Sequence, residues 1–416
     1  MILEYFSKLN VDIPKIRSVL DCDSLINGLV AAIFAVTGPV AIILSVASAA
    51  ELENDIINTW IFAAFGIGGL LTVILSLIYR QPLAMAWTMP GAALLISSLD
   101  HMSFSEAVGA FLVAGLMMVL LGISGLVSWI MAKFPSNIVM AMVAGVFLPF
   151  GLNLIDGMQN SPLICTAALL GFCVSSVFTK IGRYFPPMLA ALISGVIVAS
   201  LLGQGPVVSR EISWLAEPNI IRPVFSLDAM IELVIPLVIS VIAVQNMQGV
   251  SVLRSAGYEP PVDVLTVACG YGSLFMGMLG SVPTCITGPA NAILVSSGKK
   301  GTHYLGAVLF GTLFALVGLF SPLLTESATS MPKHFIMVLG GLAMLPVLNS
   351  AFRAAFGSIN TPQLGDFSVL VTFMITVSDI SIFNIASPFW GLIFGYIVYL
   401  LFRFSIAKQV EEDVNK

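Results

Sequence analysis

Charged residues are scarce in this chain. Only 9% of the 416 residues are Asp, Glu, Lys or Arg, whereas 58% are hydrophobic and the mean hydropathy is +1.02. A water-soluble protein of this length could not bury so much apolar surface, so the composition indicates a polytopic membrane protein. The sequence also lacks the clusters of Lys and Arg that a nucleic-acid-binding face requires.

Motifs for catalysis and metal binding are missing as well. The five cysteines show no metal-ligand spacing, and we interpret them as reduced structural thiols. The chain has no HExxH or CxxC motif, and its glycine-rich stretch 66–69 lacks the strand context of a nucleotide-binding loop. We therefore expect no enzyme activity, no cofactor and no bound metal.

Hydropathy and the positions of Gly and Pro predict an all-α integral membrane protein with about 14 membrane segments. Most segments are close to the 20 or so residues that an α-helix needs to cross about 30 Å of hydrocarbon. The third and the tenth are visibly shorter. The predicted segments are 25–48, 59–78, 83–98, 105–130, 137–155, 162–179, 187–203, 229–250, 261–279, 283–297, 303–321, 334–351, 367–380 and 387–405.

One short pattern occurs in both of the short segments. Residues 89–98 read MPGAALLISS and residues 288–297 read GPANAILVSS. Proline suits a first helical turn, where an N–H would have no partner anyway, so we predict half-helices that begin at Pro90 and Pro289 after short extended stretches. A repeat unit of seven spans is odd in number, so the second copy must be inverted in the membrane.

The basic residues predict the orientation of the chain. With the N-terminus in the cytoplasm, 14 of the 17 Lys and Arg residues fall on the cytoplasmic side, and Arg210, Arg222 and Lys333 fall outside. This asymmetry follows the positive-inside rule. We therefore expect both termini in the cytoplasm and the longest loop, 204–228, on the outer side.

Polar residues inside apolar segments are costly and usually mark a pathway. The candidates lie in segments 1, 3, 8 and 10, where two half-helix N-termini would also offer free amides and the positive end of the helix dipole to an anion. The alternatives are interhelical hydrogen bonds for the segment-8 residues, a backbone bond for Thr37 and packing for Trp87. The predicted substrate-binding residues are Thr37, Trp87, Thr88, Pro90, Gly91, Ala92, Gln245, Asn246, Gln248, Thr287, Pro289, Ala290 and Asn291.

Titratable side chains are few within the segments, and those present fall near predicted ends. For these we expect solvated histidines and water-facing or snorkelling carboxylates rather than a proton relay. The residues concerned are His101, His303, His334, Asp156, Glu232 and Asp379.

Two motifs resemble the signatures of the benzoate–proton symporter (BenE-type) family. Residues 82–95, PLAMAWTMPGAALL, are similar to PxxxAWxTPGAALL, although Met89 stands where the family usually has threonine. Residues 245–262 are similar to QNxxGxxxLRxxGYxPPV. Together with the span pattern, the resemblance covers nearly the whole chain.

The resemblance implies the architecture of uracil-permease-like and sulfate-transporter-like proteins, in which a core domain moves against a gate domain and dimers are common. The implied parts are a cytoplasmic segment 1–24, a core domain of 25–130 and 229–321, a gate domain of 131–203 and 322–405, an extracytoplasmic loop 204–228 and a cytoplasmic tail 406–416.

The resemblance and the broken helices together predict a secondary transporter of a bacterial cytoplasmic (inner) membrane that imports benzoate or a related small carboxylate with a proton by alternating access. Its expected partners are the carboxylate, a proton, membrane lipid and a second copy of the chain in a homodimer. Nucleobase permeases of this fold carry an acidic residue at the start of half-helix 10 and another in segment 8. The comparable stretches here, 288–291 and 244–246, have no carboxylate, so an anionic substrate is favoured. A nucleobase or inorganic-anion carrier is the first alternative. A channel or non-transporting scaffold is the second, and the broken helices argue against it.

Overall fold

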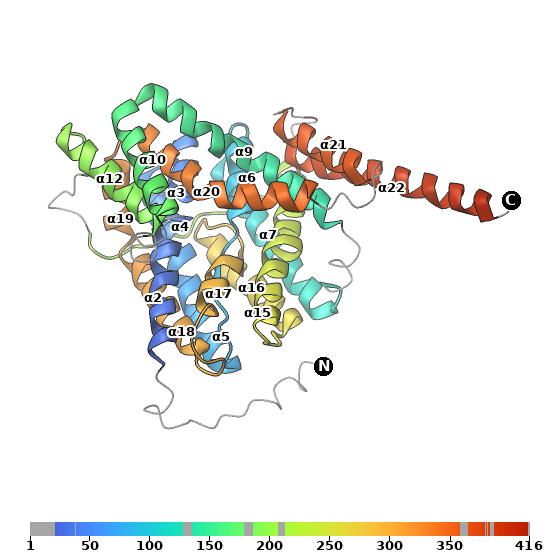
Figure 1. The fold of residues 1–416 in the computed structure, drawn as a ribbon, viewed down its shortest axis with the longest axis horizontal. Helices are drawn as coiled ribbons and strands as arrows, with labels where there is room; N and C mark the ends of the chain where they lie inside the picture. Colours follow the sequence, from blue (N-terminus) through green and yellow to red (C-terminus); the bar gives the residue numbers. More distant parts are fainter. Residues whose placement is uncertain are drawn as a thin grey trace.

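The structure is a bundle of helices built around one pair of short β-strands (Figure 1). It is a computed structural model that describes residues 21–37, 39–127, 135–178, 186–206, 213–357, 365–378, 380, 382 and 387–414. The label η marks π-helical stretches. The elements of the first half are α2 (Cys22–Thr37), α3 (Pro39–Ala49), α4 (Asn54–Ile61), η2 (Phe62–Ile67), α5 (Gly68–Tyr79), β1 (Met85–Trp87), α6 (Met89–Ser98), α7 (Phe104–Ser124), α9 (Ser136–Asn160), α10 (Pro162–Val177) and α12 (Pro187–Leu201).

The second half repeats the order of long helix, short strand and short helix. Its elements are α13 (Leu227–Ala229), η3 (Met230–Val234), α14 (Ile235–Ile239), η4 (Ser240–Asn246), α15 (Met247–Ser255), α16 (Val262–Met278), β2 (Thr284–Ile286), α17 (Gly288–Leu294), α18 (His303–Leu319), α19 (Ser321–Thr329), α20 (Lys333–Phe356), α21 (Gly365–Val377) and α22 (Ser387–Val414). The all-helical fold class predicted from the sequence is confirmed.

Every predicted membrane segment coincides with helical structure. Within the described residues, 7 helices are long and apolar enough to cross a membrane, or 8 if α18 and α19, which meet at 63°, count as one span. Shorter apolar helices account for most of the other segments, so the number of crossings stays a prediction. The fourth segment ends earlier than residue 130 because Gly125 takes a left-handed conformation (φ 70°) that terminates α7.

Both half-helices begin where the prolines predict. The helix α6 starts at Met89 and α17 at Gly288, each one residue before its proline, and each follows a short strand. The first segment is covered by α2 and α3, and residue 38 between them lies outside the described residues. Two interruptions of helical structure, at the starts of α6 and α17, therefore lie at the ends of β1 and β2.

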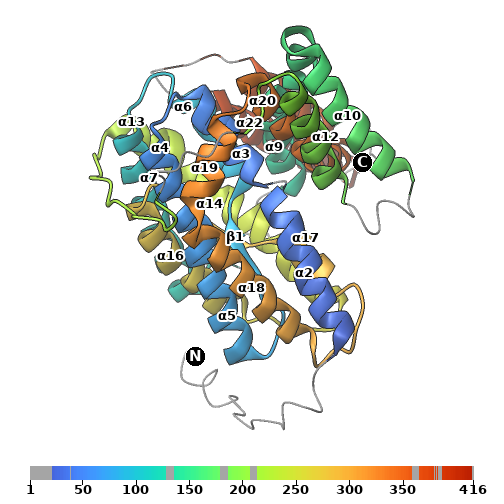
Figure 2. The ribbon, with the colours of Figure 1, turned by 90° about the vertical axis from the view of Figure 1, so that its left-hand side faces the viewer.

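The helices pack in two sets. In one set α7 packs on α16, and α18 packs on α2 and α5; in the other α20 packs on α9, α10 on α12 and α21 on α22. Figures 1 and 2 share a vertical axis, and in both the first set occupies the lower part and the second the upper part. The boundaries of a moving core and a gate domain stay a prediction.

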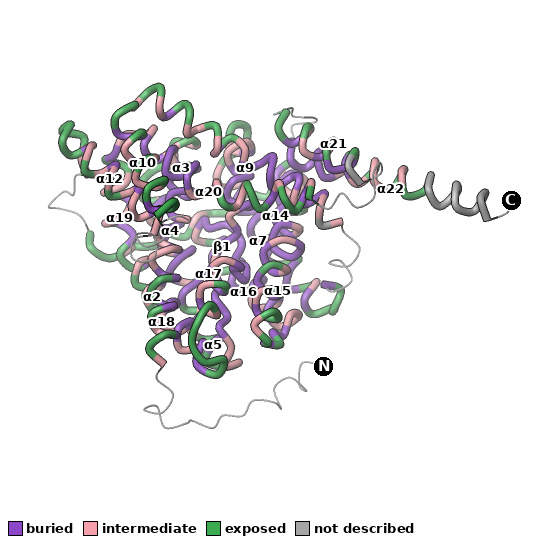
Figure 3. Tube along the Cα trace, in the orientation of Figure 1, coloured by how far each residue is buried: buried purple, intermediate pink, exposed green. Residues whose placement is uncertain are grey.

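Burial separates the strand pair from the periphery. Figure 3 shows the buried trace gathered around β1, α16 and α17, with exposed positions frequent along α10 and α12. Many exposed side chains are large and apolar, such as Leu163, Leu170 and Leu201. Such a surface suits lipid, and the strand pair is the protein's interior.

Candidate functional site

The two half-helices start from a common antiparallel ribbon. Strand β1 pairs with β2, with Met85 opposite Ile286 and Trp87 opposite Thr284. The amide of Thr88 donates to the Pro283 carbonyl at 2.9 Å, which extends the ribbon toward α6. Since the strands run in opposite directions, α6 and α17 leave opposite ends of roughly 10 Å of ribbon. The two broken helices therefore face one another, as the sequence predicts.

Hydroxyl groups on neighbouring helices complete the hydrogen bonding of the ribbon. The amide of Met85 donates to Thr72 Oγ1 at 2.8 Å, and the amide of Thr284 donates to Ser273 Oγ at 3.0 Å. The amide of Leu83 similarly donates to Ser76 Oγ. An unpaired backbone group in an apolar interior costs several kcal/mol, so these hydroxyls make the extended backbone tolerable in the membrane. Thr72, Ser76 and Ser273 are not among the residues predicted from the sequence.

Two predicted site residues, Asn246 and Asn291, have side chains that already bond within the protein. Asn291 Oδ1 accepts from the Ala84 amide at 3.0 Å, and its Nδ2 donates to the Thr287 carbonyl at 2.8 Å. Asn246 Oδ1 accepts from the Ile286 amide at 2.9 Å. Both asparagines are fully buried. They position the ribbon, which is a different task from the direct contact with substrate that the sequence suggests.

A small cavity of about 20 Å³ lies beside the ribbon. Its walls come from α2 and the first residue of α3, from the starts of both half-helices and from α18, and most of them are apolar. Four aromatic rings contribute, and Phe310 and Phe314 stack with 5.0 Å between ring centroids. The lining residues are Phe34, Ala35, Pro39, Ala86, Trp87, Met89, Thr287, Ala290, Phe310 and Phe314.

The cavity brings together only part of the predicted set. Trp87, Thr287 and Ala290 line it. Thr88, Pro90, Gly91, Ala92 and Gln245 are buried but do not line it. The half-buried Pro289 does not line it either. The side chain of Thr37 lies outside the described residues, and Gln248 is exposed. The spacing of Phe310 and Phe314 is that of any core helix face, so no pattern in the sequence distinguishes them.

The two half-helices begin differently. Thr88 caps α6, because its Oγ1 accepts from the Gly91 amide at 3.3 Å and lies 3.4 Å from Ser240 Oγ. Thr287 makes no such side-chain cap on α17, and its side chain lines the cavity instead. Among the described residues that line the cavity, Thr287 is therefore the one with a hydroxyl.

Two expectations about titratable residues are wrong, those for Glu232 and His303. Glu232 is only 3% exposed, although it was expected to face water. His101 is exposed, as expected, and its Nε2 lies 2.9 Å from Glu232 Oε2. His303 is 5% exposed and its Nδ1 lies 2.9 Å from the hydroxyl of Tyr258. Proximity to a predicted span end indicates depth in the membrane, but helix packing and side-chain partners decide exposure.

The chain matches the family model described as "BenE: Benzoate membrane transport protein" over residues 19–401. An "Inner membrane protein YdcO" of Escherichia coli (strain K12) is 31% identical over 91% of this chain and 95% of its own length. A "Benzoate membrane transport protein" of Acinetobacter baylyi is 29% identical over 90% of this chain and 94% of its own length.

Solved structures share the fold at low sequence identity. The transmembrane domain of a cyanobacterium bicarbonate transporter, BicA, superposes with a TM-score of 0.61 at 15% identity and covers 90% of this chain and 97% of its own. The overall structure of SLC26A9 gives a TM-score of 0.67 at 12% identity over 96% of this chain and 67% of its own. These likenesses establish the fold, and the family match establishes a bacterial inner-membrane transport protein rather than an enzyme.

Proposed function

The chain belongs to the benzoate membrane transport protein family, and from that premise we propose that it imports benzoate or a related small carboxylate together with a proton. The observation that carries the proposal is the cavity beside the strand ribbon, with its four aromatic rings. An aromatic acid needs an apolar, ring-shaped surface for one end and hydrogen-bond donors for the other.

In the proposed complex the aromatic ring lies among Phe34, Trp87 and Phe310, which come from three different spans. The carboxylate faces the hydroxyl of Thr287 and the nearby start of a half-helix. Backbone and hydroxyl donors in a low-dielectric interior can hold an anion without Lys or Arg. Asn246 and Asn291 then act through the ribbon that they fix, because their side chains already bond to it.

The proposed transport step requires the cavity to open. A space of about 20 Å³ admits about one water molecule, so benzoate cannot occupy it in this conformation. Two larger cavities lie toward the predicted outer side, one of about 290 Å³ lined by α6, α9, α21 and α22, and one of about 250 Å³ lined by α3, α4, α19 and α20. Relative movement of the two sets would connect such a space with the ribbon, which is the alternating access we propose.

An inorganic-anion carrier is the second candidate, because one structural relative is named a bicarbonate transporter. The aromatic lining argues against it, since a small hydrated anion gains nothing from four rings. A nucleobase carrier is disfavoured for another reason. The ring N–H groups of a nucleobase call for a carboxylate acceptor, and no acidic side chain lines the cavity among the described residues.

Uptake into proteoliposomes tests the proposal. The purified chain should take up labelled benzoate saturably under an inward pH gradient, and a protonophore should abolish accumulation. Benzoic acid crosses lipid unaided, so protein-free liposomes provide the subtraction and benzoate counterflow a second measurement. If bicarbonate, sulfate or uracil raises the melting temperature of the protein and no aromatic acid does, an inorganic-anion or nucleobase carrier is favoured instead.

A further inference from the structure

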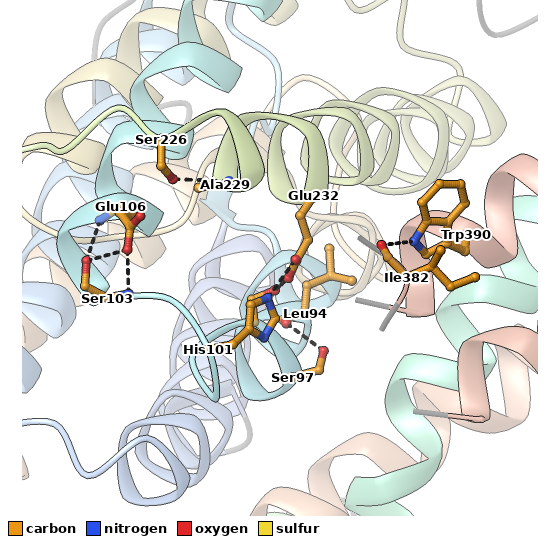
Figure 4. Close-up of polar contacts among 11 residues, drawn as sticks. Leu94, Ser97, His101, Ser103, Glu106, Ser226, Ala229, Glu232, Ile382 and Trp390 are labelled. Atoms are coloured by element: carbon orange, nitrogen blue, oxygen red, sulfur yellow. Dashed lines mark hydrogen bonds and ion pairs between the residues drawn. The ribbon is translucent and has the colours of Figure 1, made fainter. Parts of the chain in front are cut away.

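Glu232 is the one buried carboxylate among the residues that the structure describes. It lies in η3, and two groups at the end of α6 approach it. Ser98 Oγ donates to Glu232 Oε1, and His101 Nε2 lies 2.9 Å from Oε2 (Figure 4). Burying a carboxylate costs desolvation free energy, which the hydrogen bonds from Ser98 and His101 partly offset.

In the other repeat the matching serine bonds to an amide, and the nearby carboxylate of Asp21 accepts from the Lys299 amide and the Thr302 hydroxyl instead. Ser297, at the equivalent end of the second repeated motif, donates to Asn27 Oδ1 at 3.2 Å, and Asn27 Nδ2 donates to the Ser297 carbonyl at 2.9 Å. Asn27 thus does for Ser297 what Glu232 does for Ser98. A neutral amide therefore joins the serine to a span in one repeat, whereas a carboxylate paired with a histidine does so in the other.

The remaining charged groups near the pair are few. On the elements packed against η3, these are Asp100 beside His101, Glu106 in the first turn of α7 and Asp228 one turn before Glu232. Glu106 is bonded to the amide and hydroxyl of Ser103 at 2.8 Å each, and Asp228 is exposed. The described part of the chain places no Lys or Arg in this group, so His101 is the proton donor available to Glu232.

We propose that Glu232 and His101 form the proton-binding site of the transporter. His101 is partly exposed and Glu232 is not, so His101 exchanges the proton with water and Glu232 holds it in the interior. Asp100 and Ser97 line the cavity of about 290 Å³ on the predicted outer side, which supplies the water. The imidazole is the side chain that changes charge most readily near neutral pH. The inference rests on the proposed proton coupling.

The helix α6 joins this pair to the proposed substrate site. Its first residue, Met89, lines the cavity beside the ribbon, and its last, Ser98, contacts Glu232. Ten helical residues span about 15 Å, so one rigid element carries both sites. A negative charge at the C-terminal end of a helix is unfavourable. Protonation of Glu232 would therefore remove an unfavourable interaction with the end of α6.

Infrared difference spectroscopy of the full-length protein between acidic and neutral pH tests proton binding without any substrate. The parent should show the C=O band of a buried carboxylic acid, which Glu232→Gln removes and the matched variant Asp228→Asn retains. His101→Gln should shift the pH at which the band appears and leave the band itself present. An identical band in the parent and in Glu232→Gln would overturn the assignment.

Transport then tests coupling. In proteoliposomes that contain a pH indicator, Glu232→Gln should lose benzoate-driven acidification of the lumen while benzoate counterflow continues, and Asp228→Asn should behave as the parent. Unchanged acidification in Glu232→Gln would mean that the proton crosses on benzoic acid itself, and the inference would be wrong. If the parent moves no benzoate at all, the proposed function fails, and the infrared band still decides whether the pair binds a proton.

Discussion

The half-helices α6 and α17 share one sequence pattern and differ in how the protein holds them. Aligning MPGAALLISS with GPANAILVSS pairs Ala92 with Asn291 in the first turn. Asn291 anchors α17 through its side chain to the strand before the other half-helix, whereas α6 has no such side chain and depends on the Thr88 cap. Both copies of the repeat keep the break in the backbone, but different side-chain hydrogen bonds hold the two half-helices in place.

The ends of the two half-helices also differ. Ser297 meets the neutral Asn27, and Ser98 meets the pair of Glu232 and His101. The serine of one copy therefore bonds to a carboxylate that is paired with a histidine, whereas the serine of the other bonds to an amide. Duplicated elements in a transporter can divide structural and functional tasks between them, and substitutions can test that division.

Asn291→Asp should have the largest effect. A carboxylate there cannot donate to the Thr287 carbonyl, which Asn291 Nδ2 reaches at 2.8 Å, and it would be buried without a cationic partner. We expect a loss of about 3–5 kcal/mol in unfolding free energy, in addition to weaker anion binding. Thermal unfolding in detergent measures it, with the exposed Asn160→Asp as control. A melting temperature close to that of the parent would show that Asn291 does not anchor the ribbon.

Trp87→Ala should weaken benzoate binding by about 2 kcal/mol, or roughly 30-fold in Kd, because the ring forms a wall of the cavity. Trp87→Phe keeps an aromatic surface and should lose much less. Ile286, which occupies the equivalent position in the second repeat, does not line the cavity, so Ile286→Val should leave Kd unchanged. Calorimetric titration with benzoate compares the three. Equal losses at Trp87 and Ile286 would indicate a general packing effect.

Thr88 and Thr287 directly precede the two half-helices, and substituting them should affect stability and binding differently. Thr88→Val removes the cap of α6 and should lower the unfolding free energy by about 1 kcal/mol with little change in Kd. Thr287→Val removes no cap and should instead raise the Kd for benzoate by about fivefold, which is about 1 kcal/mol. Unfolding and binding are measured on both variants. The same pattern in both would contradict the difference between the half-helices.

Gln248→Ala should have the smallest effect. The sequence places Gln248 in the predicted site, but its side chain is exposed and lines no part of the cavity beside the ribbon. We expect changes within about 0.5 kcal/mol in both unfolding and benzoate binding. Initial rates of uptake provide the check. A severe loss of transport would show that Gln248 faces the substrate in another conformation.

Local chemistry explains why much of the fold could be predicted. Proline at the start of each half-helix and glycine after α7 act within one turn of helix, so their effects can be deduced from neighbouring residues. Partners far apart in the chain cannot be deduced in this way. Glu232 and His101 are 131 residues apart, and the sequence pattern gave depth in the membrane without saying what each side chain would meet.

The sequence by itself determined the membrane environment, the order of the helices and the two breaks, because hydropathy and backbone restrictions are properties of each segment alone. Only the tertiary structure decided what those breaks create. It paired the two strands, gave Asn246 and Asn291 to the ribbon, closed four aromatic rings around one cavity and brought a histidine to a buried carboxylate. Each of these depends on contacts between distant segments, and the energy of such a contact exists only once the helices have packed.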